Sequence, residues 1–175
     1  MTHQFARFTS VLALAIAAAI GLPALAMNMG AGVTMTKVAG PYRIVLQLLP
    51  AEPFYTQAQY AKEHPKAGML VVRGAAPVRL DAPTHPNHHL IVHVYDNATG
   101  KAQTTATVAI RYAPASGPAR NLPIVEMQAI GKGAQSTHYG NNVYLPNGSY
   151  TVTVDVNGNT SIFHVTAKAA SMSKM

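Results

Sequence analysis

Short runs of alternating apolar and polar residues recur along most of this chain. The clearest run covers residues 149–156, where Tyr150 and three valines alternate with polar residues. Alternation with a period of two places the apolar side chains on one face of a β-strand. Asn157-Gly158, a dipeptide typical of tight hairpin turns, follows this run, and residues 160–166 supply a returning strand. This part of the sequence therefore predicts an antiparallel hairpin with one buried face.

Further strands are predicted where β-branched or alternating runs are bounded by Pro, Gly or Asn. They cover residues 42–49, 68–73, 77–80, 90–96, 104–113, 122–129 and 142–145. One helix is predicted, over residues 55–63, because His64-Pro65 ends it. Seven to nine short strands separated by turns predict an all-β chain folded as an immunoglobulin-like antiparallel β-sandwich. Only the architecture is implied, because the chain has neither Cys nor Trp.

The N-terminal residues have the features of an export signal. Arg7 is the only charged residue among residues 1–26, and an apolar run over residues 11–20 precedes the small-residue site Ala24-Leu25-Ala26. This order predicts a signal peptide over residues 1–26 and a periplasmic protein. We then expect a flexible arm over residues 27–39, one sandwich domain over 40–168 and a flexible tail over 169–175. No later run reaches membrane-spanning length, so no membrane span is predicted after cleavage.

Charge and motif content exclude several classes of function. The chain has 13 Lys and Arg against 6 Asp and Glu, but the basic residues are scattered, which argues against a nucleic-acid interface. Neither a G-x-S-x-G elbow nor a phosphate-binding or dinucleotide-binding glycine motif is present. The chain is therefore not predicted to be an enzyme. Without cysteine, any metal site must use His, Met, carboxylate or backbone oxygen.

Histidines are concentrated in one segment. Four of the eight lie in residues 84–93, namely His85, His88, His89 and His93. On a strand, His89 and His93 have equal parity and point to the same face, together with Ile91 and Tyr95. Neutral imidazole is the commonest side-chain metal ligand, so this face is a candidate metal site. The alternative is a solvated sheet edge that merely carries polar histidines.

A second candidate segment contains a thioether and an imidazole. Met127 precedes a predicted glycine-rich loop over residues 131–140, and His138 lies within that loop. Each alone has an ordinary interpretation, Met127 as core filler and His138 as a turn residue. Together with the strand histidines they offer soft and imidazole ligands without a thiolate, a set that suits copper better than zinc or iron. The predicted metal ligands, in order, are His138, His89, Met127 and His93.

Residues 122–154 also resemble a known family. They contain H-Y-G-x-N at residues 138–142 and a Gly-x-Tyr turn at residues 148–150, and residues 42–53 (Y-R-I-V-L-Q-L-L-P-A-E-P) are similar to the opening strand of that family. The family is that of periplasmic iron-uptake accessory proteins, named the Fe2+ transport protein family. The resemblance implies an immunoglobulin-like sandwich, a homodimer, bound copper and an inner-membrane iron permease as partner, with His89 similar to a strand histidine of the family. A weaker resemblance is to FixH/YtkA-like modules linked to copper and oxidase assembly.

Together these observations predict a periplasmic metal-binding protein that acts in iron or copper uptake or homeostasis. Copper is the expected ion, with iron or zinc as alternatives. The expected partner is an inner-membrane metal permease or another periplasmic metal protein. The competing hypothesis is a metal-free periplasmic interaction or adhesion module with the same fold.

Overall fold

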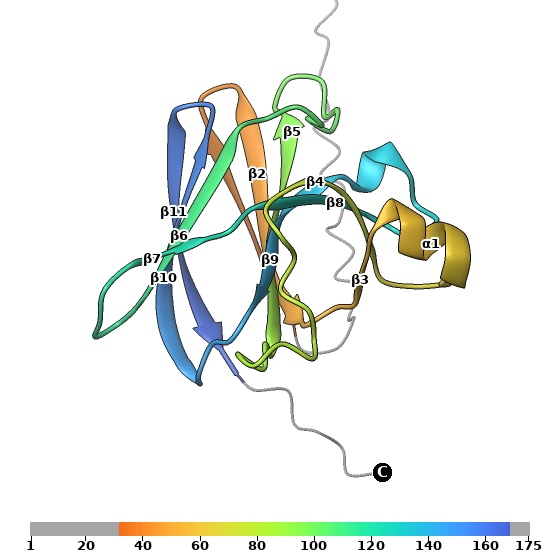
Figure 1. Cartoon of the computed structure of the whole chain (residues 1–175). Helices are drawn as coiled ribbons and strands as arrows, with labels where there is room; N and C mark the ends of the chain where they lie inside the picture. The colour runs from red at the N-terminus through yellow and green to blue at the C-terminus, as the bar shows by residue number, and fades with distance from the viewer. Residues whose placement is uncertain (1–31, 169–175) are drawn as a thin grey trace, which may run out of the picture.

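A computed structural model describes residues 32–168 of the chain (Figure 1). The predicted signal peptide, most of the predicted N-terminal arm and the predicted tail lie outside the described residues. The elements, in chain order, are β1 (Val33–Ala39), β2 (Tyr42–Pro50), β3 (Phe54–Tyr55), α1 (Gln57–Glu63), β4 (Met69–Gly74), β5 (His88–Asp96), β6 (Val108–Pro114), β7 (Arg120–Leu122), β8 (Val125–Ala129), the 3-10 turn η1 (Ala134–Ser136), β9 (His138–Val143), β10 (Gly148–Val156) and β11 (Asn159–Ala167).

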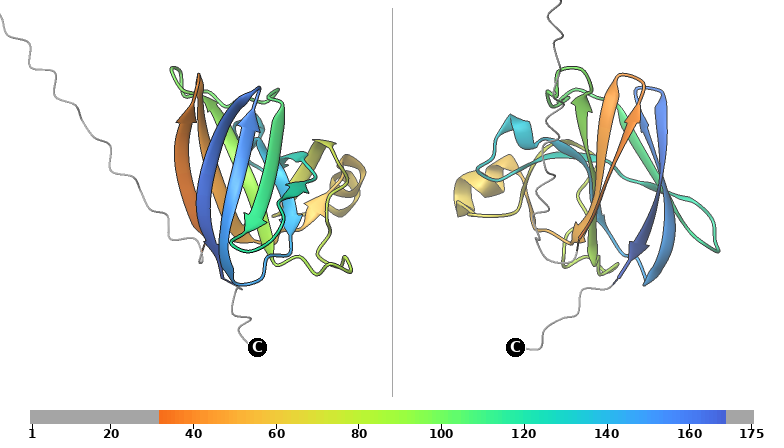
Figure 2. Two further views of the ribbon diagram at one scale, coloured as in Figure 1. Left: turned by 90° about the vertical axis from the view of Figure 1, so that its left-hand side faces the viewer. Right: turned by 180° about the vertical axis from the view of Figure 1, so that it is seen from behind.

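The strands form two sheets that pack face to face (Figures 1 and 2). One sheet has seven strands in the order β1-β2-β5-β9-β8-β4-β3, and the other has four in the order β11-β10-β6-β7. The strand pairs are antiparallel except β3 with β4. The prediction of an all-β antiparallel sandwich is confirmed. Eleven strands exceed the predicted seven to nine, because β1 and the two-residue β3 were not expected.

The predicted C-terminal hairpin is confirmed. β10 and β11 pair in antiparallel register from Gly148 opposite Ala167 to Val156 opposite Asn159. The turn residues Asn157 and Gly158 have φ values of 49° and 83°. Two successive positive φ angles are what a two-residue hairpin turn requires, and Asn-Gly adopts them at least cost.

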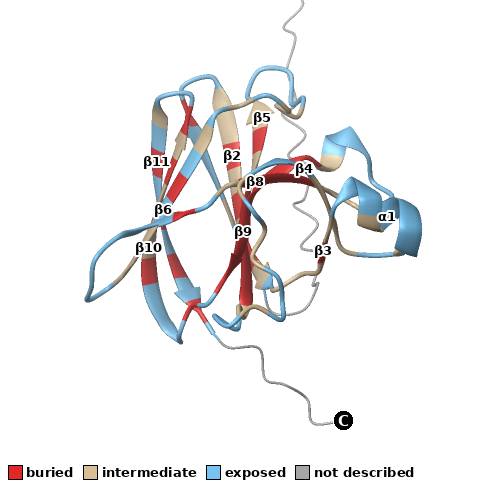
Figure 3. Ribbon diagram, in the orientation of Figure 1, coloured by how far each residue is buried: buried red, intermediate tan, exposed pale blue. Residues whose placement is uncertain are grey.

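Alternate residues of the strands fill the main core between the sheets. Ile44, Leu46, Leu90 and Val92 contribute from the large sheet, and Phe163 contributes from the small sheet. Figure 3 shows this pattern as buried segments that alternate with exposed ones along β10 and β11. β5 departs from this alternation, because its first five residues are all buried. Both faces of β5 must therefore be covered.

The second face of β5 is covered by the far end of its own sheet. A smaller core contains Phe54 of β3, Ile91 of β5, and Val125 and Met127 of β8. β3 is the seventh strand in order and β5 the third, so the sheet must curl for Phe54 to reach β5. Right-handed twist of a long sheet produces this kind of curl. We call β3, α1 and β4 the cap, because Figure 1 shows them on the side of β5 and β9 that faces away from the small sheet.

The sequence prediction was wrong about the end of the N-terminal arm. Val33–Ala39 forms β1, which pairs with β2 along its whole length. The run V-T-M-T-K-V-A alternates, and Met35 packs against the main core. The methionine and small residues upstream obscured this short alternation.

Other boundaries also differ from the prediction. Residues 77–80 are not a strand, and the Val78 amide donates instead to the side chain of Asn141 at 2.8 Å. The single strand predicted over 122–129 is divided into β7 and β8, which belong to different sheets. Pro123 separates them, because proline cannot donate to a sheet ladder.

The predicted helix is confirmed from Gln57, with Thr56 and Gln59 forming a capping box. None of the helices in residues 32–168 is long and apolar enough to cross a membrane.

Candidate metal centre

Three of the four predicted ligands lie in one row across the large sheet. Met127 of β8 is the register partner of His138 in β9. The β5–β9 ladder ends with Val92 opposite Tyr139, so one further step places His93 beside His138. All three side chains point away from the main core, toward the face that the cap covers. The strand order β5-β9-β8 therefore brings together residues that are far apart in the sequence.

His89 reaches the same cluster diagonally from the far end of β5. Its ring centroid lies 5.8 Å from that of His138, and the His93 centroid lies 5.0 Å from that of His138. Gly140 lies on β9, opposite Ile91 of β5, and presents no side chain to the cluster. A Cβ at Gly140 would collide with the Leu90 carbonyl oxygen and come within 2.8 Å of the Ile91 Cα. Glycine therefore keeps β9 close to β5.

The cluster is mostly sealed from solvent. The relative exposure of both His89 and Met127 is 0%, and that of His138 is 2%. The Phe54 ring packs edge-on against His89 with centroids 5.5 Å apart. His93 is half-buried and stacks on Tyr95, which in turn lies under the guanidinium of Arg43. His93 is thus the member of the cluster nearest to solvent.

Hydrogen bonds fix which nitrogen of the His138 and His89 rings carries the proton. His138 Nδ1–H donates to the Ser136 carbonyl at 2.7 Å, and His89 Nδ1–H donates to Asn142 Oδ1 at 3.0 Å. His93 Nε2 lies 3.2 Å from Gln47 Oε1, and with the amide in this orientation Nε2 carries the proton. An oxygen acceptor on one ring nitrogen requires the proton there and leaves a lone pair on the other.

The orientation of the Asn142 amide is itself determined. Its Oδ1 also accepts the backbone N–H of Glu52 at 3.1 Å, and its Nδ2 donates to the carbonyls of Glu52 and Val78 at 2.8 and 2.9 Å. Reversing the amide would place donor against donor and acceptor against acceptor. The tautomer of His89 therefore follows from the backbone around it.

The other three ring nitrogens are buried and have no hydrogen-bond partner. They are His89 Nε2, His93 Nδ1 and His138 Nε2. A buried polar atom without a partner costs about 1–3 kcal/mol, so three in one cluster require an explanation. Each carries a lone pair and none carries a proton, so they cannot satisfy one another. A ligand that accepts electron pairs would satisfy all three.

The rings do not yet form a closed ligand set. Among residues 32–168, no group of three or more His, Asp or Glu side chains is arranged to hold a metal ion as it stands. His138 contacts both other rings and is central, whereas no ring contact joins His89 directly to His93 in the described chain. Two imidazoles bound to one tetrahedral ion have centroids about 5 Å apart, given metal–nitrogen bonds of about 2.0–2.1 Å. The spacing of each neighbouring pair fits this value, although the three nitrogens do not converge.

Burial dominates the proton affinity of the cluster. It lowers the pKa of His89 from 6.5 to about 4, against the hydrogen bond from Asn142, which raises it. Burial, with a smaller effect of the neighbouring His93, lowers the pKa of His138 to about 3. Burial also lowers the pKa of His93, and the nearby Thr137 backbone offsets part of that shift. The three rings are therefore neutral at physiological pH, as metal ligation requires.

The low pKa values predict acid sensitivity of the metal-free protein. Below pH 6.5 the unfolded histidines take up protons, whereas folded His89 and His138 stay neutral down to about pH 4 and about pH 3. The unfolded state then binds more protons than the folded state. The free energy of unfolding is therefore highest above pH 6.5, with respect to these histidines, and falls as the pH decreases below 6.5. We expect the urea unfolding midpoint to fall between pH 7.5 and 5.0, and to fall less in His138→Gln. His164→Gln, on the exposed side of β11, is the control and should keep the wild-type slope. Equal midpoints at the two pH values would contradict this.

The structure brings together all four predicted ligands but leaves two neighbouring histidines outside the cluster. His85 is exposed in the loop before β5, and His88 points to the opposite face and contacts the Lys168 carbonyl. The prediction that His138 lies in the loop over residues 131–140 was wrong, because His138 begins β9. The sequence did not identify Gln47 or Asn142 as hydrogen-bond partners. For Gln47 a signal existed, since it is the one polar residue within an apolar strand run.

Comparison of the chain with protein-family models, with curated proteins and with solved structures gives no match. The resemblance to iron-uptake accessory proteins therefore stays a prediction. The class that the structure itself defines is a β-sandwich with a curled seven-stranded sheet.

Proposed function

We propose that this protein binds one copper ion through His138, His89, His93 and Met127. The observation that carries the proposal is the set of three buried, proton-free ring nitrogens without a partner. Met127 adds a thioether as the fourth donor, because it is the direct cross-strand neighbour of His138. An electron-pair acceptor at the centre of this cluster offsets the cost of burying the three nitrogens.

The donor chemistry favours copper over the alternative ions. The cluster contains imidazoles and a thioether, and the carboxylate of Glu126, which precedes Met127 on β8, is engaged by Arg73 at 2.6 Å. Hard cations such as Mg²⁺ and Ca²⁺ require oxygen ligands, which the cluster does not supply. Imidazole with thioether suits copper in either oxidation state, and Cu(II) also exceeds Zn(II) and Fe(II) in intrinsic affinity. Zinc or iron would have to bind without the carboxylate or thiolate that commonly accompanies imidazole.

Closure of the site requires small movements only. His138 is central and tethered through Nδ1, so we expect the rings of His89 and His93 to turn toward its Nε2. His93 has the freer path because it is half-buried, and its bond to Gln47 is the longest of the three tethers at 3.2 Å. Ligand rings held by outer hydrogen bonds are typical of metal sites.

The proposed role is metal uptake or homeostasis in the periplasm. It rests on the predicted signal peptide, which lies outside the described residues, and on the neutral, soft ligand set. The proposed partner is an inner-membrane metal permease or another periplasmic metal protein that exchanges copper with this site.

The test is a metal titration of the purified protein, with its N-terminus determined by mass spectrometry. Metal-free protein is titrated with Cu(I), Cu(II), Zn(II) and Fe(II) against competing chelators. We expect one tightly bound equivalent of copper and weaker binding of zinc and iron. Cleavage after Ala26 would support export. Failure of copper to bind at one equivalent would overturn the proposal and favour the metal-free interaction module.

A further inference from the structure

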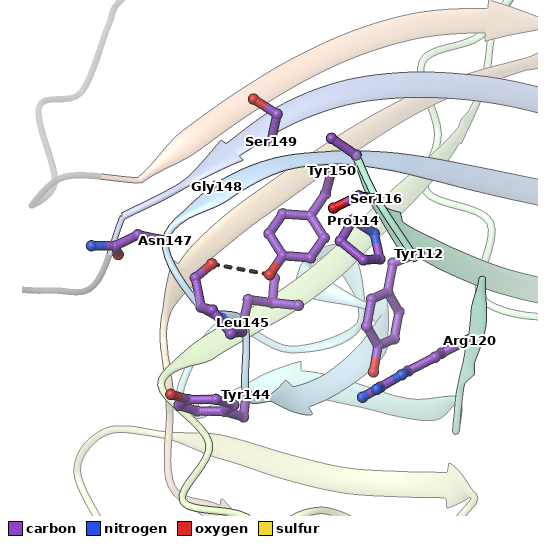
Figure 4. Close-up of a pocket in the computed structure, with 12 residues that line it drawn as sticks. Tyr112, Pro114, Ser116, Arg120, Tyr144, Leu145, Asn147, Gly148, Ser149 and Tyr150 are labelled. Carbon is purple, nitrogen blue, oxygen red and sulfur yellow. Dashed lines mark hydrogen bonds between the residues drawn. The ribbon is translucent and has the colours of Figure 1, made fainter. Parts of the chain in front are cut away.

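A cavity of about 470 Å³ opens at one end of the sandwich, apart from the histidine cluster (Figure 4). It borders the main core, because Tyr150 of β10 belongs to that core and Tyr112 of β6 packs against it. Three tyrosines, two prolines and one cation are among the twelve residues that line it: Tyr112, Tyr144, Tyr150, Pro114, Pro146 and Arg120. Its volume falls in the range of small-molecule sites.

A second chamber of about 370 Å³ shares three of these residues. Tyr112, Arg120 and Tyr144 line both spaces, so the two chambers meet at these side chains. Figure 4 shows the Arg120 side chain extending toward the Tyr112 hydroxyl, with the Tyr144 ring on the other side of the space. A ligand at this junction would contact both phenol rings and the guanidinium.

The walls of the cavity are held in place by the sheets. Tyr112 is the register partner of Arg120, and Tyr150 is the partner of Pro114. The Tyr150 hydroxyl donates to the Pro146 carbonyl at 3.0 Å, which closes the floor. The Tyr150 ring is therefore fixed in place.

The loop that carries Tyr144 is also tied down. Asn87 accepts the Leu145 amide at 2.8 Å and donates to the Leu145 carbonyl at 2.9 Å. A site whose walls are already ordered loses little conformational entropy when it binds a ligand. The backbone of the cavity is thus preformed, and the side chains of Arg120 and Tyr144 are exposed at its mouth.

The charge of the cavity has one sign. Arg120 is the only charged residue among the described residues that line either chamber. The two ion pairs in residues 32–168 are Arg73 with Glu126 and Arg79 with Asp81, so Arg120 is in neither. An arginine at a preformed cavity with no acidic neighbour favours an anion, and its planar fork matches a carboxylate. Tyrosine rings and proline faces favour a planar aromatic body.

We propose that this cavity binds a small aromatic monocarboxylate, with the carboxylate on Arg120 and the ring between Tyr112 and Tyr144. The proposal does not depend on copper binding, because the residues concerned are distinct from the histidine cluster. Tyr112 and Tyr144 act as stacking surfaces, and Arg120 selects the charge.

The test uses phenylacetate as probe, with phenylacetamide as its neutral counterpart and hexanoate as a non-aromatic anion. Calorimetric titrations are made on the metal-free and the copper-loaded protein. We expect saturable phenylacetate binding in both forms, and weaker binding of the other two probes. Arg120→Gln should weaken phenylacetate binding about tenfold or more while leaving phenylacetamide unchanged, because only the charged hydrogen bond is lost. Tyr144→Ala should weaken both aromatic probes.

Arg111→Gln is the matched control. Arg111 precedes Tyr112 on β6 but is exposed on the other face of the strand, so phenylacetate affinity should stay at the wild-type value. Absence of saturable phenylacetate binding would overturn the proposal. Equal weakening by Arg111→Gln and Arg120→Gln would reduce it to general charge attraction and would also overturn it. Equal affinity for hexanoate would refute the aromatic part.

Discussion

His138→Ala is expected to lower copper affinity by about 100-fold or more, the largest effect of any single change in the cluster. The His138 ring contacts the rings of His89 and His93, and its strand position pairs it with Met127. Its removal therefore separates the remaining three donors from one another. Loss of a directly bound donor exceeds the 10–100-fold cost that is usual for losing an outer hydrogen-bond partner. Chelator competition with Cu(I) and Cu(II) measures the change.

His164→Ala is the control for this experiment. His164 is exposed on β11, and its Nδ1 lies 3.3 Å from the Thr151 hydroxyl. The substitution therefore removes an imidazole without changing the cluster. Circular dichroism of both variants checks that the sandwich is intact. Wild-type copper affinity in a folded His138→Ala protein would mean that copper binds elsewhere on the chain.

Asn142→Ala is expected to lower the free energy of unfolding by about 3–5 kcal/mol. The Asn142 side chain takes part in four hydrogen bonds, two with the backbone of Glu52, one with the Val78 carbonyl and one with His89. It is 1% exposed, so water cannot readily replace it. Each buried group left without a partner costs about 1–3 kcal/mol, and several are left at once. Urea unfolding of the metal-free protein measures the loss.

The same substitution should also lower copper affinity by about 10–100-fold, because His89 loses the acceptor that fixes its tautomer. Asn121→Ala, at an exposed position of β7, is the matched control and should change neither quantity. A loss of stability below 1 kcal/mol in Asn142→Ala would show that Asn142 does not hold the segments around Glu52 and Val78 to the sheet.

The sequence predicted the sandwich because alternation is a local signal. The hairpin of β10 and β11 follows directly from it, and Asn157-Gly158 marks the turn. The curl of the large sheet is different, because it depends on which strands become neighbours. Phe54 lies in a two-residue strand, too short to show a period, yet it covers His89. No local pattern could have predicted that contact.

In the candidate site too, local patterns predicted some features, and the order of the strands determined the others. Equal parity correctly placed His89 and His93 on one face of β5. That Met127 and His138 lie on the next two strands depends on the order β5-β9-β8, which the sequence does not state. His138 was expected in a loop because glycines precede and follow it. In the structure Gly140 instead permits close contact between two strands.

The cap gives the cluster a way to open that does not involve the core of the sandwich. β3 has two residues, α1 buries none of its side chains, and the ladder of β4 with β8 shifts register between Val71 and Arg73. Elements with few buried contacts open at a lower free energy than the whole domain. A brief local unfolding of the cap would therefore uncover His89 and Met127 while the other strands of both sheets remain paired. The ligand held by the cluster would then exchange at the rate of local opening of the cap, which is much faster than global unfolding.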